Sequence, residues 1–477
     1  MKRILCLALI GVLLIGALAS CSKKDQTEET NPSAATDENT AYDPSAAPKP
    51  YMDDFGGYNF RVLARGSGAW KSNDILGEVM GNTVDQAVFI RNETVSKQYN
   101  FTISESKEKD WVSTAENTVL SGVDAFDMWS FKMNDVPALA QAGYVYDLRE
   151  VEYINLDADY YDQVLRKQGT FANYEFFLVG DLLYQDDLAT QCVVFNHNIW
   201  ESDKQLGQEY GVESLYDLVD QGKWTLGVFQ ELAKKTTKDD GDGVWNEKDQ
   251  YGMSHQNADL LALNIACGNN LVTKNEDDIF VLNKSEKQVT NLQSIMSLLN
   301  SGCSMYTNGS DAHFKKGLQM FNLNWVQVLP TYASTGVDYG IIPPPKADTN
   351  QTEYYSFITT YGSNCITICK SVEDANKSAS IIELLSYESR KSVTPKLSDF
   401  LFNGRSVNHP EDVDMLHKVL DSRSYEYCYL WTVGGVYGTM IGINQAQGQG
   451  VASAIESLES AVNESVARKL ERIENLS

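Results

Sequence analysis

An acidic loop at residues 239–249 combines the side chains that a metal ion would require. The segment reads DDGDGVWNEKD, with carboxylate and amide groups around a glycine turn. Calcium takes oxygen ligands at alternate positions, with glycine at the sixth position of the loop. If Gly243 is that glycine, the following ligand positions hold oxygen donors: Asp240, Asp242, Asn246 and Asp249. The loop is therefore a candidate structural calcium site.

The first position of this loop departs from the calcium pattern. It is Lys238, and the carboxylate usually found there lies one residue later, at Asp239. A shifted loop would use Asp239 as a ligand instead. The alternative is a metal-free turn, in which Asx side chains accept hydrogen bonds from nearby backbone amides. In both cases the loop is structural, and we expect that no cofactor is required.

Catalytic motifs are mostly missing from the chain. It contains no HExxH, GxSxG, P-loop or CxxC sequence. Its five histidines are scattered without the spacing of metal ligands. Paired carboxylates for glycoside hydrolysis stay open among the 65 acidic residues, because their pairing is spatial. The motif search therefore favours a binding protein over an enzyme.

The amino terminus has the features of a bacterial lipoprotein signal. Met1-Lys2-Arg3 is positively charged, residues 4–18 are almost wholly apolar, and LASC follows at residues 18–21. This pattern is typical of a signal peptide, and its apolar core is short for a membrane span. We therefore expect residues 1–20 to be removed and Cys21 to carry the lipid. The alternative is ordinary cleavage, in which Cys21 has no role.

Residues 21–50 are expected to form the lipidated cysteine and a disordered tether. From residue 22 onward this segment has four prolines and no Leu, Ile, Val, Met, Phe or Trp. Such a segment cannot bury enough apolar surface to offset its ordering entropy. The rest, Tyr51–Ser477, is long for one core and suits two lobes. The net charge of −26 argues against nucleic acid and against a polyanionic ligand.

Six cysteines remain after Cys6 and Cys21 are set aside. Their spacing fits neither a zinc site nor a small disulfide scaffold. We expect most of them to be buried, free and apolar in behaviour. They are Cys192, Cys267, Cys303, Cys365, Cys369 and Cys428.

Apolar periodicity predicts alternating strands and helices after the tether. The expected order is strand 59–64, helix 82–99, strand 101–106, helix 110–120, strand 126–131 and helix 135–142. This order implies a parallel sheet covered by helices. Ligands bind beyond the carboxyl ends of such strands, so Arg65–Trp70 and Trp129–Asn134 should lie on one rim. A long amphipathic helix over residues 451–473 is expected to close the chain.

Three later stretches carry short motifs in a specific order. GKWT at residues 222–225 precedes a helix, the acidic loop and DQYG at residues 249–252. Residues 174–196 place Gly-Asp and an apolar run before VVFN. Residues 314–346 combine a glycine, the strand ending in NLNW, and YGIIPPP. This order resembles the family 1 extracellular solute-binding proteins of sugar ABC importers, which include maltose-binding protein.

The resemblance implies an α/β fold of the periplasmic-binding-protein type. It would have two lobes, a cleft between them and several hinge crossings. Lobe 1 would comprise residues 51–190 and about 327–393, and lobe 2 about 191–326 and 394–477. The second crossing would follow Trp325, and the third would lie near residues 393–399.

Sugar recognition requires aromatic faces against the ring and polar groups for its hydroxyls. The resemblance places Trp325 where maltose-binding protein stacks on sugar. Other ligand contacts are expected from aromatic, acidic and amide side chains at strand ends and crossings: Trp129, Trp431, Trp70, Phe131, Asp187, Asp181 and Asn324. The alternative for each aromatic residue is core packing, and for Asp187 it is a helix cap or a solvated turn.

The sequence thus predicts a lipid-anchored, extracytoplasmic solute-binding protein of an ABC transporter. Its partners would be a mono- or oligosaccharide, the permease subunits and the membrane, through the lipid; we expect a monomer without nucleic acid. One alternative is a surface lipoprotein that acts on polysaccharide as a hydrolase or lyase. Another is a peptide- or polyamine-binding protein, in which Asp181, Asp186 and Asp187 would supply carboxylates.

Overall fold

A computed structural model describes residues 43, 45–66, 74–403 and 406–476 of the chain. The expected signal peptide, Cys21 with its expected lipid, most of the expected tether, and Trp70 lie outside the described residues. Within the described residues, no helix has both the length and the apolar character needed to cross a bilayer. Residues 44–477 are grouped by their contacts into one unit.

The first sheet contains the predicted parallel strands. Its strands are β1 (Tyr58–Arg65), β2 (Phe101–Glu108), β3 (Met128–Lys132) and β12 (Asn364–Thr367), in the order β12-β3-β1-β2. β1 pairs in parallel with β2 and β3, and β12 is antiparallel to β3. The helices between them are α1 (Thr83–Tyr99), α2 (Trp111–Ser121) and α3 (Val136–Gln141). The strand–helix alternation predicted for this part of the chain is confirmed.

The second sheet has five strands in the order β10-β4-β9-β5-β8. They are β4 (Gln191–Asn196), β5 (Tyr251–His255), β8 (Ser304–Tyr306), β9 (Gln319–Trp325) and β10 (Tyr339–Ile342). Every residue of β4 is buried, which agrees with its continuous apolar run. β5 pairs in parallel with both β8 and β9, so these three strands end at the same edge of the sheet.

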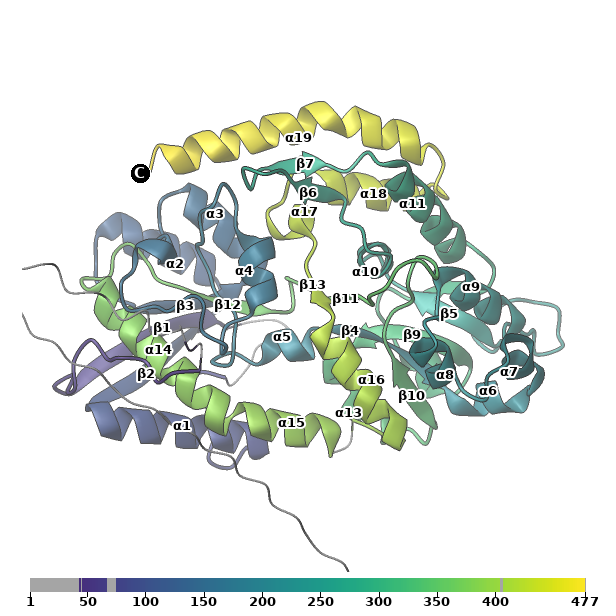
Figure 1. Ribbon diagram of the computed structural model, residues 1–477, viewed down its shortest axis with the longest axis horizontal. Helices are drawn as coiled ribbons and strands as arrows, with labels where there is room; N and C mark the ends of the chain where they lie inside the picture. Colours follow the sequence, from purple (N-terminus) through teal and green to yellow (C-terminus); the bar gives the residue numbers. More distant parts are fainter. Residues whose placement is uncertain (1–42, 44, 67–73, 404–405, 477) are drawn as a thin grey trace, which may run out of the picture. The chain divides into compact units, whose positions relative to one another are not determined.

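Helices, short strands and 3₁₀ turns cover and connect the two sheets (Figure 1). The helices after α3 are α4 (Gln163–Gly169), α5 (Gln185–Leu188), α6 (His197–Ser202), α7 (Gln205–Tyr210), α8 (Leu215–Asp220), α9 (Leu226–Lys235), α10 (Asp259–Ala266), α11 (Glu286–Leu299), α12 (Ala312–Lys315), α13 (Leu329–Tyr332), α14 (Ala375–Ser392), α15 (Thr394–Phe402), α16 (Pro410–Asp421), α17 (Tyr427–Leu430), α18 (Val436–Gln445) and α19 (Val451–Glu474). The other elements are β6 (Val272–Lys274), β7 (Phe280–Leu282), β11 (Ser356–Phe357), β13 (Arg423–Ser424), η1 (Met133–Asp135), η2 (Leu148–Glu150) and η3 (Val326–Val328).

Two segments that pass between the sheets pair with each other. The first follows α5, and the second follows β11. Thr190 and Ile358 form an antiparallel bridge, and Thr359 N donates to Ala189 O at 3.2 Å. Both segments are short and buried at these positions. They are therefore the natural hinge of the fold.

The second crossing lies later in the chain than the sequence predicts. The expected return to the first lobe after about residue 326 is wrong, because β10 pairs antiparallel with β4 in the second sheet. Ile341 and Ile342 lie directly opposite Val194 and Val193 in that pairing. The chain first rejoins the first sheet at β12, so the crossing runs from Ile358 to about Ser363.

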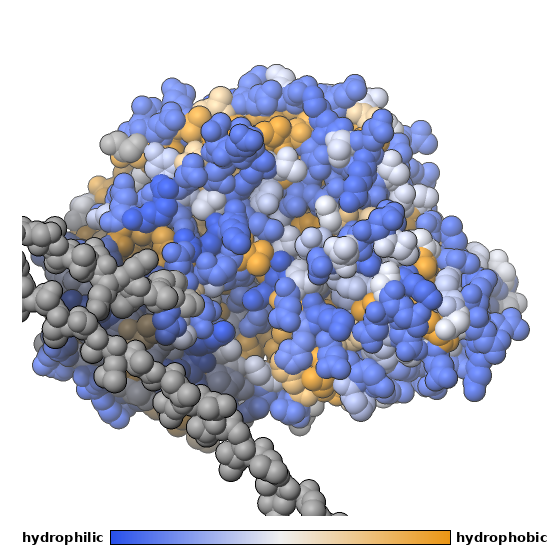
Figure 2. Space-filling model, in the orientation of Figure 1, coloured by the Kyte–Doolittle hydropathy of each residue, from blue (hydrophilic) through white to orange (hydrophobic). Residues whose placement is uncertain are grey.

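The closing helix forms as predicted and contacts both halves of the fold. α19 packs against α3 beside the first sheet, and against α11, α18 and β7 beside the second. Figure 1 shows it as a long helix along one border of the molecule. The six cysteines after Cys21 are all buried and free, which confirms that prediction. The face drawn in Figure 2 is mainly hydrophilic, in line with the acidic composition.

Candidate ligand-binding site

A pocket opens at the carboxyl ends of β5 and β8 in the second sheet. It has a volume of about 370 Å³ and lies between these strand ends, the end of α11 and the end of α18. Its lining is almost entirely polar but uncharged at neutral pH, and we call it the amide pocket. The described residues that line it are His255, Asn257, Leu299, Asn300, Ser301, Ser304, Tyr306, Asn444 and Gln445.

The imidazole of His255 stays neutral in this pocket. Its Nδ1 lies 2.8 Å from Ser304 Oγ, and the side chain is buried. Burial lowers the pKa of His255 to about 4, because the charged form would lose its hydration. Tyr306 is 52% exposed, and its ring lies 5.4 Å from the imidazole in an edge-on arrangement. The pocket thus offers neutral hydrogen-bonding groups beside an exposed aromatic face.

A row of aromatic rings runs from the hinge toward this pocket. Trp325 lies 6.2 Å from Phe357, which lies 6.4 Å from Tyr429, and Tyr429 lies 4.9 Å from Tyr437. Burial raises the pKa of Tyr437, and the neighbouring groups that act in the same direction include Tyr429 and Tyr306. The row, Trp325–Phe357–Tyr429–Tyr437, therefore leads to the mouth of the amide pocket at Tyr306.

A buried carboxyl group lies behind the aromatic row. Asp259, at the start of α10, accepts hydrogen bonds from Gln191 Nε2 at 2.8 Å and from Gln256 N at 2.9 Å. Burial raises the pKa of Asp259 to about 7, and the two hydrogen bonds oppose this shift. Asp259 thus ties the first residue of β4 to the loop that follows β5.

The carboxyl ends of β1 and β3 hold a second group, which we call the rim cluster. It comprises Arg65, Trp111, Lys132, Asp135 and Tyr361. The Arg65 guanidinium carbon and the Lys132 ammonium lie 5.2 and 4.9 Å from the centre of the Tyr361 ring. Asp135 binds Lys132 Nζ at 3.2 Å and accepts from Trp111 Nε1 at 2.9 Å. Tyr361 is 47% exposed and lies within the second crossing, before β12.

Trp325 ends β9 beside the first crossing, whereas the sequence predicts it at the second crossing. It is half-buried, it lies opposite Gln191 in the sheet, and its neighbour Val326 donates its amide to Thr190 O at 2.9 Å. Asn324 does not share this location. Its Nδ2 donates to the Tyr332 hydroxyl at 2.9 Å on the opposite, buried face of β9, so its predicted contact with ligand is wrong for this structure.

Three other predicted aromatic contacts are core residues. Trp129 and Phe131 are fully buried and stack on each other at 5.3 Å on one face of β3. Trp431 is 1% exposed; its Nε1 donates to Gly169 O at 2.8 Å, and its ring packs against Phe171 and Phe280. Packing within the core therefore accounts for all three side chains, and none offers a face to a ligand.

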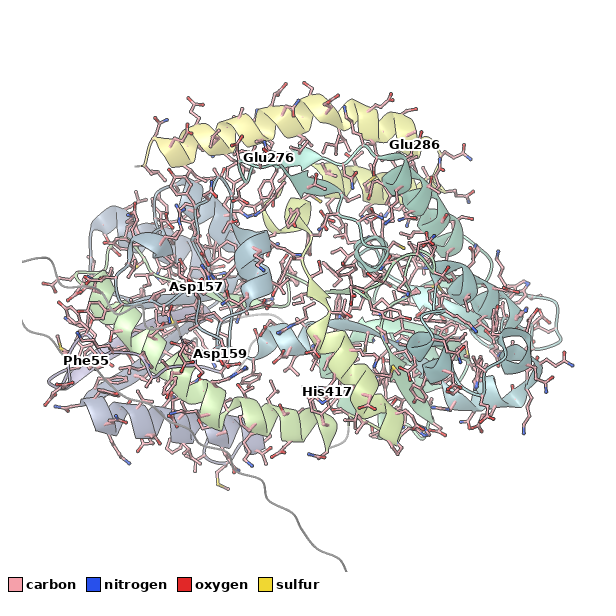
Figure 3. All side chains as sticks on the ribbon, in the orientation of Figure 1. Phe55, Asp157, Asp159, Glu276, Glu286 and His417 are labelled. Atoms are coloured by element: carbon pink, nitrogen blue, oxygen red, sulfur yellow. The ribbon has the colours of Figure 1, made fainter. Side chains whose placement is uncertain are left out.

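Asp181 and Asp187 come together beside the first crossing, in a smaller pocket of about 210 Å³. Asp187 pairs with Arg423 at 2.6 Å, and Asp181 pairs with Arg390 at 3.4 Å. Burial raises the pKa of Asp181 to about 7, although Arg390 opposes the shift. Asp159 and His417, labelled in Figure 3, also line this pocket near α14 and on α16. Arg390 and Arg423 thus form ion pairs with the carboxylates that would bind the amino groups of a polyamine.

The acidic loop is held by the hydrogen bonds expected of a metal-free turn. Asp239, Asp240, Asp242 and Asn246 each accept a bond from the backbone amide two residues later. Asp249 is buried and accepts from the amides of Asp240 and Asn246. Asp239, Asp240 and Asp249 nevertheless bring carboxylate oxygens within 4.8 Å of one another. A calcium ion in this loop would therefore have Asp239, rather than position 238, as its first ligand.

Sequence reasoning missed most of the amide pocket. Asn300 donates to Asn444 Oδ1 at 3.0 Å, although 144 positions separate them in the chain. The segment 424–438 is dense in aromatic residues, and this signal pointed to the correct stretch. Within it, Tyr429 and Tyr437 join the aromatic row, whereas the selected Trp431 packs in the core.

Comparisons with known proteins agree on the fold. No protein-family model matches the sequence, and no curated protein matches it. Among solved structures, a cyclo/maltodextrin-binding protein complexed with maltotetraose aligns with 12% identity and a TM-score of 0.56, over 89% of this chain and 99% of its own. An ABC substrate-binding protein, Lmo0181 from Listeria monocytogenes, in complex with cycloalternan, aligns with 12% identity and a TM-score of 0.54, over 86% and 99%.

A third solved structure shares the fold but carries a different ligand. UgpB from Mycobacterium tuberculosis, in complex with glycerophosphocholine, aligns with 13% identity and a TM-score of 0.55, over 87% of this chain and 99% of its own. These alignments span nearly the whole of each relative and both sheets of this chain. The chain therefore has the two-lobe α/β fold of the solute-binding proteins of ABC transporters.

Proposed function

We propose that this chain is an extracytoplasmic solute-binding lipoprotein that captures a carbohydrate between its lobes and delivers it to an ABC permease. The observation that carries the proposal is the amide pocket with its neighbouring tyrosines. Its lining is neutral, polar and bordered by an exposed ring, Tyr306. These are the groups that saccharide hydroxyls and C–H faces require.

The chemistry of the pocket matches a hydroxyl-rich ligand. Asparagine, glutamine and serine side chains both donate and accept hydrogen bonds, as each sugar hydroxyl does. The neutral imidazole of His255 behaves in the same way, because its pKa of about 4 leaves it uncharged at neutral pH. A ligand that lacked hydroxyls would leave these groups unpaired on closure, which costs free energy. The pocket thus favours saccharides over peptides with apolar side chains.

The paired crossings supply a mechanism for capture. A ligand that touches the amide pocket on one lobe and the rim cluster on the other makes both sets of contacts only when the lobes are close. Binding then shifts the population toward the closed form. The bridge between Thr190 and Ile358 supports a rotation confined to a few backbone positions. Trp325, beside this bridge, would cover one face of a bound sugar ring.

Delivery and anchoring complete the proposal. The chain has no P-loop, so the energy for transport would come from the ATPase of the permease. A lipid on Cys21 would hold the protein at the membrane, with the following polar segment as a tether. We propose a monomer as the working form. The carbohydrate ligands of the two sugar-binding neighbours support this class of cargo, and glycerophosphocholine in the third marks the alternative to be tested.

Calorimetric titration of the soluble Tyr51–Ser477 fragment with neutral and acidic mono- and oligosaccharides tests the proposal. We expect one saccharide class to bind, and Tyr306→Ala and Trp325→Ala to weaken it at least about tenfold. Trp245→Ala is the matched control, because Trp245 is 53% exposed in the acidic loop. Binding of peptides or polyamines alone would contradict the carbohydrate assignment. Hydrolysis of the bound saccharide would favour the enzyme alternative.

A further inference from the structure

The rim cluster differs in charge from the amide pocket. Two cationic side chains, Arg65 and Lys132, share the same two aromatic rings, Trp111 and Tyr361. We propose that the rim cluster binds an anionic group on the saccharide, so that the cargo is a sugar carrying one carboxylate or phosphate. This inference rests on the proposed function and narrows its substrate class.

The arrangement of the rim cluster suits a single negative charge. Asp135 pairs with Lys132, which leaves the three charged groups of the cluster with a net charge of +1. Lys132 is largely shielded from solvent, with 17% of its side chain exposed. Arg65 is 3% exposed, and burial lowers its pKa from the usual value. A ligand anion placed here would be weakly screened, and its hydrogen bonds would be charge-assisted.

Unpaired polar atoms in the same strands provide an independent observation. Ser130 Oγ and Asn364 Oδ1 have no hydrogen-bond partner among the described residues, and the two side chains are 1% and 3% exposed. Ser130 precedes Lys132 by two residues on β3, and Asn364 lies directly opposite Lys132 on β12. Side chains at these positions share one face of the sheet. They therefore point to the same side as the lysine.

The turn that carries Tyr361 adds two more unpaired groups. Thr360 Oγ1 and Ser363 Oγ are fully buried and lack a partner among the described residues. Buried hydroxyl groups are almost always paired in folded proteins, so a set of unpaired ones needs an explanation. A polar ligand seated at the rim cluster would supply it, because hydroxyls donate to an anion and also bond to sugar hydroxyls.

The charge of the whole chain limits the ligand to few negative charges. With a net charge of −26, the protein repels a polyanion at long range. A single carboxylate or phosphate is attracted at short range by Lys132 and Arg65, where ionic screening acts less. The neutral amide pocket would then bind the uncharged remainder of the same molecule. An acidic mono- or oligosaccharide meets both conditions.

Titration calorimetry on the soluble Tyr51–Ser477 fragment tests this inference. The probes are saccharides with a single uronic acid residue, neutral saccharides of equal length, and sugar monophosphates. We expect an acidic saccharide to bind roughly 10- to 100-fold more tightly than its neutral counterpart, the usual gain from a charge-assisted bond. Preference for uronates or for sugar phosphates identifies the anionic group.

Lys132→Met should remove most of the preference for the acidic saccharide and spare the neutral one. Lys377→Met is the matched control, since Lys377 makes a similar contact with the Tyr58 ring at 4.7 Å, away from the rim cluster. Equal affinities for acidic and neutral saccharides would overturn the inference but not the proposed function. If neither kind of saccharide binds, the proposed function itself fails. The comparison of acidic with neutral saccharides uses the unaltered protein, so it decides even if the Lys132 variant does not fold.

Discussion

Trp431→Ala should destabilise the fold while leaving ligand affinity intact. The indole is 1% exposed, it packs against Phe171 and Phe280, and its Nε1 donates to Gly169 O at 2.8 Å. Removing a buried tryptophan typically costs about 3–5 kcal/mol, which includes the cavity left behind. At about 2.1 cal/mol/K of unfolding entropy per residue, a folded part of roughly 430 residues has about 0.9 kcal/mol/K. The melting temperature should therefore fall by roughly 3–6 °C.

Chemical unfolding and calorimetry on the same samples separate the two effects. Trp431→Phe keeps an aromatic ring but loses the N–H bond to Gly169 and part of the buried volume, so it should cost about 1–3 kcal/mol, less than the alanine variant. Both variants should bind saccharide as the parent does below their melting temperatures. Trp325→Ala should show the reverse pattern, with weakened binding and a small loss of stability. Loss of binding in Trp431→Ala at unchanged stability would refute the assignment of this residue to the core.

Three further predictions concern charge. Burial raises the pKa of Asp259 from 3.8 to about 7, so the contribution of Asp259 to stability is full below pH 4 and is lost as the pH rises to 7. The free energy of unfolding, measured with urea, should therefore fall by roughly 4 kcal/mol between pH 4 and pH 7 through this group, and Asp259→Asn should abolish that fall. Arg423→Met leaves the carboxylates of Asp186 and Asp187 without the guanidinium that they share. The free energy of unfolding at pH 7 should therefore fall by about 3–5 kcal/mol. An unchanged free energy would show that the two acids are protonated. Backbone amides already donate hydrogen bonds to the side chains of the acidic loop. The melting temperature in millimolar calcium should therefore equal the melting temperature in the presence of a chelator. A higher melting temperature in calcium, lost in Asp249→Asn, would instead establish a calcium site.

Much of the first sheet could be predicted from local sequence. Its strands and helices alternate with distinct periods, and parallel pairing is the usual consequence of that alternation. The position of Trp325 at the end of a strand was also predictable, because an apolar run within a recognisable motif ends there, but the crossing predicted to follow it does not occur. The extent of the second sheet could not be predicted, because β10 is short and its partner β4 lies far away in sequence. Nothing local distinguishes Tyr339–Ile342 from a strand of the first sheet.

The choice among aromatic residues likewise depends on distant contacts. Residues 427–431 form a short helix and its end, so Tyr429 and Trp431 point to different neighbours. Trp431 is buried because Phe171, from a loop, and Phe280, from β7, meet it there, and both are remote in sequence. The amide pocket is assembled in the same way from the ends of separate helices and strands. Such juxtapositions leave no periodic signal in the sequence.

The position of α19 has a consequence for cargo affinity. The helix contacts α3 on one side of the hinge and α11 on the other, and Leu476, two residues after its end, lies against Gly143. Any rotation about the crossings must therefore slide or bend this helix. The apparent dissociation constant of a hinged receptor equals its intrinsic value divided by the fraction of molecules that are competent to bind. Substitutions at the end of α19 would thus change the affinity for the proposed ligand from a distance, without altering which ligand is chosen.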